Sequence, residues 1–145
     1  MDLKYMAGSA ALVMMLVGGV AGAAPADDAA LADAAERRDT ALVRTLLDAG
    51  ADVNVAQVDG MTALHWAVYH DDADTARVLV ASGAAVGIAN RYGVPPLSVA
   101  ATNGNADVVT LLLDGGADAN TTVRGGETVL MAAARTGSLG AVRAL

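Results

Sequence analysis

The chain has 145 residues and a formal net charge of −7, from nine Lys and Arg against sixteen Asp and Glu. This acidic balance excludes a basic nucleic-acid-binding domain. The absence of cysteine excludes a disulfide scaffold, a thiol nucleophile and a cysteine-ligated metal site. Alanine supplies 34 residues, whereas isoleucine and tryptophan occur once each. We therefore expect a core of Ala, Leu and Val, built as thin layers of closely packed helices.

Residues 1–23 differ in kind from the rest of the chain. A short charged start with Lys4 precedes an apolar stretch, and the small residues Ala21-Gly22-Ala23 follow it. This order is typical of a secretory signal peptide, and we expect cleavage after Ala23. Because about 20 apolar residues can also span a bilayer, an uncleaved inner-membrane anchor is the alternative. Since a cysteine-free exported domain fits a bacterial periplasm, we expect a periplasmic or secreted protein.

A period of 33 residues runs through residues 24–145. Four leucines and three glycines keep this spacing, and an alanine follows each glycine. They are Leu31, Leu64, Leu97 and Leu130, and Gly50, Gly83 and Gly116. A fixed period of this length predicts a repeat solenoid, in which each unit buries its apolar face against its neighbours. The units span residues 29–56, 57–89, 90–122 and an incomplete 123–145, about 3.5 units in all.

Each unit is predicted to contain two short helices and a hairpin-like loop. In the second unit we expect one helix to begin near Leu64 and another to run from Ala73 to Ala81, with Gly83 ending it. Residues 84–94 then form a loop that projects toward the following unit. Four residues with side chains that cap helix N-termini recur just before the second helix of each unit. They are Asp39, Asp72, Asn105 and Ser138. The fold class is therefore an all-α repeat solenoid.

Two motifs of the second unit resemble the ankyrin repeat. They are Thr62-Ala63-Leu64-His65-Trp66-Ala67 and Gly83-Ala84, and the resemblance extends over about residues 29–145. The third unit departs from the pattern with Pro95-Pro96-Leu97-Ser98, and the fourth with Thr128-Val129-Leu130-Met131. Both lack the usual histidine. In the second unit, Asp71 also stands where the family usually has glycine, so we expect weaker local turns.

No catalytic, cofactor-binding or metal-ligating residue is predicted. His65 and His70 with three aspartates between positions 71 and 74 have the residue types of a metal site. We favour a structural interpretation, because the resemblance implies that His65 bonds to the Thr62 hydroxyl, and Asp72 is an expected N-cap. No serine lies near a histidine in a catalytic motif. We therefore expect a protein that is not an enzyme, with no cofactor, no small-molecule substrate and no nucleic-acid partner.

The resemblance implies that the hairpin tips and the concave face of the first helices bind another protein. The candidate positions on the hairpins are Val58, Asp59, Met61, Arg91, Tyr92, Val94, Arg124 and Glu127. Those on the first helices are Tyr69, His70, Thr102, Asn103, Arg135 and Thr136. Tyrosine and arginine are enriched among the residues that dominate binding energy at interfaces. The three arginines also favour an acidic patch on the partner.

Three hypotheses about function follow. The leading one is an exported, non-catalytic scaffold that binds an unidentified protein through its concave surface. The second retains the N-terminal segment as a membrane anchor that displays the repeats. The third treats these residues as the binding module of a longer enzyme. Because the sequence stops at Leu145, inside the second helix of its unit, we expect a longer natural protein with a glycine four residues beyond Leu145.

Overall fold

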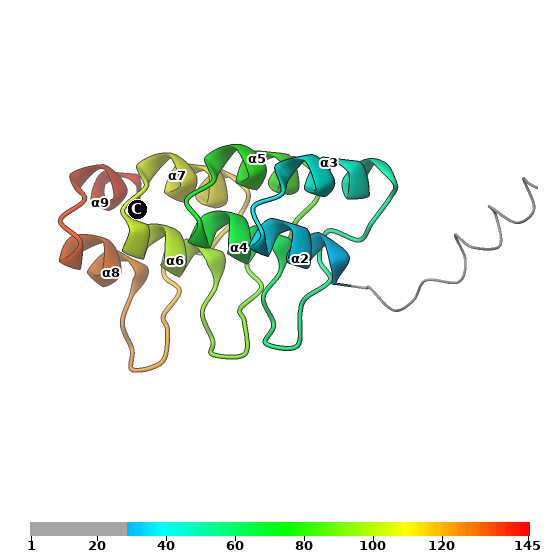
Figure 1. The fold of residues 1–145 in the computed structure, drawn as a ribbon. Coiled ribbons are helices and arrows are strands. Elements are labelled where there is room, and N and C mark those ends of the chain that lie inside the picture. Colours follow the sequence, from blue (N-terminus) through cyan, green and yellow to red (C-terminus); the bar gives the residue numbers. More distant parts are fainter. Residues whose placement is uncertain (1–28) are drawn as a thin grey trace, which may run out of the picture.

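The computed structural model describes residues 29–145, so the predicted signal peptide, residues 1–23, lies outside the described part. Residues 29–145 form eight helices in two rows. The inner row consists of α2 (Ala30–Glu36), α4 (Ala63–Tyr69), α6 (Pro96–Asn103) and α8 (Val129–Arg135). The outer row consists of α3 (Thr40–Asp48), α5 (Ala73–Ala81), α7 (Ala106–Asp114) and α9 (Leu139–Ala144). Figure 1 shows the rows side by side, with three long loops projecting from the inner row. The prediction of an all-α repeat solenoid is confirmed.

Side-chain caps start all four outer helices. The carboxylate of Asp39 accepts a hydrogen bond from the Leu42 amide at 2.9 Å, and this satisfies an amide that has no partner inside the helix. Equivalent caps begin the other three outer helices at Asp72, Asn105 and Ser138. The prediction of four N-caps at 33-residue spacing is therefore confirmed. The change from Asp to Asn to Ser preserves the acceptor oxygen that starts the helix.

The inner helices begin in two different ways. Thr62 and Thr128 cap α4 and α8 through their hydroxyls. In contrast, α2 and α6 have no side-chain cap, and Pro96 is the first residue of α6. Proline is tolerated there because the amide it lacks would have no partner in the helix. The start of α6 therefore differs from those of α4 and α8.

The core is a continuous layer between the two rows. The largest fully buried side chains include Leu64, Leu79, Leu97 and Leu112. Buried alanines lie on the inner helices, and among them are Ala67, Ala100 and Ala133. Their small size lets each inner helix pack on the next, from α2 through α4 and α6 to α8. Within residues 29–145, no helix has the length and apolar character needed to cross a membrane.

The projecting loops are hairpins with very little strand pairing. Two isolated antiparallel bridges, Ala56 with Thr62 and Thr122 with Thr128, close two of these loops. The first two hairpins are bonded to each other, because the Arg91 amide donates to the Asp59 carbonyl at 2.8 Å. The Arg91 guanidinium also donates to the Val58 carbonyl at 2.5 Å. The second hairpin therefore stacks on the first, one unit along the chain.

Candidate protein-binding surface

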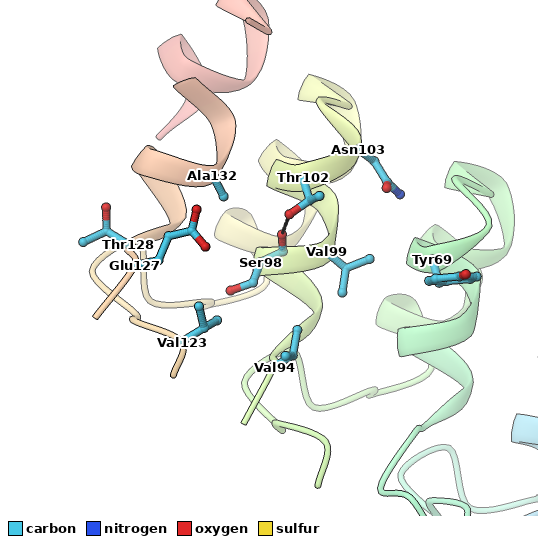
Figure 2. Close-up of a pocket in the computed structure, with 10 residues that line it drawn as sticks. All are labelled: Tyr69, Val94, Ser98, Val99, Thr102, Asn103, Val123, Glu127, Thr128 and Ala132. Carbon is cyan, nitrogen blue, oxygen red and sulfur yellow. Dashed lines mark hydrogen bonds between the residues drawn. The ribbon is translucent and has the colours of Figure 1, made fainter. Parts of the chain in front are cut away.

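A groove with a volume of about 340 Å³ lies where the inner helices meet the hairpins. It extends from α4 past α6 to α8, and Figure 2 shows Tyr69 at one end and Glu127 with Thr128 at the other. Its lining consists of Tyr69, Val94, Ser98, Val99, Thr102, Asn103, Val123, Glu127, Thr128 and Ala132. We call it the inner groove. Its size is within the range of protein ligand pockets, about 300–1,000 Å³.

Five predicted binding residues line the inner groove. They are Tyr69, Val94, Thr102, Asn103 and Glu127. These residues come from three successive units, and the stacking of equivalent positions brings them to one face. The Asn103 amide donates to the Val68 carbonyl at 2.8 Å, so it also ties α6 to α4. The Glu127 carboxylate pairs with the Arg135 guanidinium at 2.7 Å.

The remaining candidate residues lie outside the groove. Val58 and Tyr92 project from the hairpins with 90% and 59% of their surface exposed. Arg91 and Arg124 are also exposed there, and Asp59 is half-buried. Thus the hairpins offer a second exposed area beside the groove.

Two further candidates end inner helices. His70 is half-buried and stacks on Trp66, with ring centroids 5.8 Å apart. A ring nitrogen of His70 lies 2.9 Å from the Glu36 carbonyl, so this ring joins α4 to the end of α2. Thr136 is exposed at the C-terminus of α8, and its hydroxyl donates to the Ala133 carbonyl. Both side chains therefore contribute to the structure of the helix ends.

The prediction that Met61 lies on the surface is wrong. This side chain is only 9% exposed, and its sulfur accepts a hydrogen bond from the Asn90 amide at 3.4 Å. Its long, unbranched side chain packs beneath the next hairpin. Since methionine adapts readily to irregular space, it fills a gap that the stacked hairpins create. Met61 therefore belongs to the packing of the hairpins.

Five lining residues are not among the predicted binding residues: Ser98, Val99, Val123, Thr128 and Ala132. A signal for the first was present, because Ser98 stands where the second unit has His65. From the sequence alone, this departure predicts only a weaker local turn. The structure shows that it also removes a large side chain from the groove wall.

His65 shows what normally fills that place. Its Nδ1 lies 2.9 Å from the Thr62 hydroxyl and accepts from the Thr62 amide at 3.2 Å. Its Nε2 lies 3.2 Å from the Val94 carbonyl, which belongs to the next hairpin. The predicted bond between His65 and Thr62 is thus confirmed. Because Nδ1 accepts from an amide, the ring proton is on Nε2, where it donates to the carbonyl.

Burial shifts the titration of His65. Desolvation lowers the pKa of this imidazole, although the Val94 carbonyl and the Asp59 carboxylate oppose the shift. At Asp72, burial raises the pKa, but hydrogen bonds from Thr75 and the charge of Arg38 outweigh it and hold the pKa below its usual value. Both groups thus serve the fold. Across residues 29–145, no cluster of three or more histidine, cysteine or acidic side chains has the arrangement of a metal site.

Comparisons with known proteins agree with this architecture. A family model described as ankyrin repeats, in three copies, matches residues 5–90, 31–123 and 82–145. These matches together span most of the chain. No curated protein matches it.

Proposed function

Because the chain belongs to the ankyrin-repeat family, we propose that residues 29–145 bind a partner protein through the inner groove and the hairpin tips. Ankyrin repeats are generally protein–protein interaction modules and are typically non-catalytic. The observation that carries the proposal is the convergence of five predicted binding residues, from three units, on one groove. Tyr69 and Tyr92 are each 59% exposed, and tyrosine is a residue type that dominates binding energy at many interfaces.

Affinity capture with two matched double variants tests this function. Tyr69→Ala with Thr102→Glu changes the inner groove, and Thr45→Ala with Thr110→Glu changes exposed positions of the outer row. After crosslinking in the native host, a partner should be captured by the wild type and by the outer variant. The groove variant should capture it about tenfold less, which corresponds to a loss of about 1.4 kcal/mol of binding free energy.

The variants must first melt cooperatively and retain the wild-type circular dichroism spectrum. The proposal fails if the groove variant captures the same proteins as the wild type. It also fails if the outer variant is the one that loses the partner, since the binding face would then be the outer row.

We also propose that the protein is exported. The support is the sequence of residues 1–23, with its charged start, apolar centre and Ala21-Gly22-Ala23 end. The intact mass of the protein purified from its host tests this, because cleavage would leave Ala24 as the first residue. An uncleaved chain in the membrane fraction would instead support a membrane-anchored display module, and an uncleaved soluble chain would refute export.

A further inference from the structure

The same position differs in three successive units. It holds His65 in α4, Ser98 in α6 and Met131 in α8. His65 is fully buried and fills the space between α4 and the hairpin that follows, where Nε2 reaches the Val94 carbonyl. Ser98 ends at its hydroxyl, and Pro95 replaces the Thr62 that would bond a histidine ring. The third unit therefore lacks a ring that the second unit has, and the inner groove opens at this point.

The hydroxyl of Ser98 has no hydrogen-bond partner. Ser98 is only 6% exposed, and its Oγ is the one buried side-chain oxygen or nitrogen without a partner among residues 29–145. In Figure 2 the side chain points from α6 toward the segment with Val123 and Thr128, across the groove. Burying a polar group without a hydrogen-bond partner costs free energy. A ligand that donates a hydrogen bond to this oxygen would recover that cost. Ser98 is also one of the residues that line the inner groove.

The remaining lining restricts the occupant to a neutral, largely apolar group. Val94, Val99, Val123 and Ala132 provide apolar walls. The only charged lining residue is Glu127, and its carboxylate is already paired with Arg135. A charged group would therefore lose its water without gaining an unpaired counter-charge.

We propose that the inner groove receives the indole ring of a partner's tryptophan, with the ring against the valine walls and its N–H donating to Ser98 Oγ. This assignment rests on the proposed function, because it names the partner group that the groove binds. An indole combines a large apolar surface with a single donor, which matches an apolar wall with a single unsatisfied oxygen. An indole ring is also larger than the imidazole of a histidine at position 98 would be, so it fills more of the 340 Å³ groove.

Titration of the ¹⁵N-labelled protein with free indole tests the ring site without a partner. Indole should shift the amide signals of Val94, Val99 and Ala132 in a saturable way. Indene has nearly the same shape without the N–H, and it should bind several-fold more weakly. The site is refuted if indole gives no saturable shifts, or if the shifts map to the outer row.

Variants at Ser98 separate two contributions to indole binding: the hydroxyl of Ser98 and the groove volume that this small side chain leaves open. Ser98→Ala removes only the oxygen and should reduce indole binding to the level of indene. Ser98→His fills the groove with the second unit's own ring and should abolish binding of both probes. Thr110→His, an exposed change on α7, is the matched control and should bind indole like the wild type. If Ser98→His does not fold, Ala132→Leu narrows the groove from α8, and undiminished binding by that variant would overturn the site.

A competition experiment separates failure of this inference from failure of the proposed function. N-acetyltryptophanamide should release the captured partner from the wild-type protein. If it binds the groove and the partner stays attached, the indole assignment is wrong although the protein-binding function stands. If indole binds but no partner is captured, the groove is confirmed as an indole site. The proposed protein-binding function is then refuted, and so is the role of the groove in binding a partner's tryptophan.

Discussion

Different residue types adopt the same left-handed backbone conformation in equivalent turns of the four units. The turns between paired helices place Arg38, Asp71, Gly104 and Gly137 at φ values of 59°, 59°, 73° and 71°. Only glycine adopts this left-handed region freely, because other residues have a Cβ that crowds the backbone. The strain that sequence reasoning located at Asp71 is therefore shared by Arg38, one unit earlier.

Replacing Arg38 with glycine should stabilise the protein. Arg38→Gly removes the strain and should raise the free energy of unfolding by about 0.5–1 kcal/mol. The reverse change, Gly137→Ala, should lower it by about 1 kcal/mol. A Cβ at Gly137 meets no atom within 4 Å, so its effect is purely that of the backbone. Urea denaturation measures both, and a destabilised Arg38→Gly beside a neutral Gly137→Ala would contradict this account.

His65 should make the protein sensitive to mild acid. Desolvation lowers its pKa in the folded state, whereas the unfolded chain takes up a proton near the ordinary value of 6.5. Below that pH the unfolded state binds more protons, so the free energy of unfolding decreases as the pH falls. The stability that His65 provides is complete above pH 6.5 and is lost progressively below it.

Urea denaturation between pH 7.5 and pH 5 measures this dependence. His65→Gln should be less stable at neutral pH, because it breaks the bonds to Thr62 and Val94, but its stability should vary less with pH. His70→Gln is the matched control, since it removes a histidine and leaves His65 in place. If the pH dependence persists in His65→Gln and disappears in His70→Gln, His70 causes it and the assignment to His65 is wrong.

At the scale of the structural elements, the first hairpin approaches the second closely at Gly60. Gly60 has φ 82°, and a Cβ there would lie 2.8 Å from the Arg91 amide nitrogen of the next hairpin. Gly126 has φ 77°, but a Cβ there would meet no atom within 4 Å. The two glycines thus share a backbone conformation and differ in their surroundings.

This pair isolates the contribution of hairpin stacking. Gly126→Ala should cost only the backbone term, whereas Gly60→Ala should cost about 1–3 kcal/mol more, because the hairpin backbone must move. Thermal unfolding of both variants measures the difference. Equal losses would show that the contact between the hairpins does not constrain their stability.

The helices were predictable from the sequence, and the groove was not. Repeated leucines and N-caps such as Asp72 mark the helices because these signals are local. The groove instead depends on the absence of a histidine ring at position 98 and on the packing of three successive units. Met61 was also beyond sequence reasoning, because its burial depends on the hairpin stacked over it. Five of the groove residues could be named in advance, because the resemblance to the ankyrin repeat implies which positions face a partner.

The whole molecule makes one face from equivalent positions of successive units. The inner groove needs α4, α6, α8 and two hairpins, so no single unit contains it. The same stacking buries the alanines and leucines between the rows. The core and the proposed binding face therefore have a common origin in the packing of one unit on the next.

Site-specific photocrosslinking in the native host tests most directly whether this face binds a protein. A photoreactive phenylalanine derivative replaces Thr102 in the inner groove or Thr110 on the outer row, and both positions are exposed. On irradiation, the Thr102 variant should yield a discrete crosslinked species that contains a second protein, and the Thr110 variant should not. A crosslink from Thr110 alone, or from neither position, would contradict the assignment of the inner groove as the binding face.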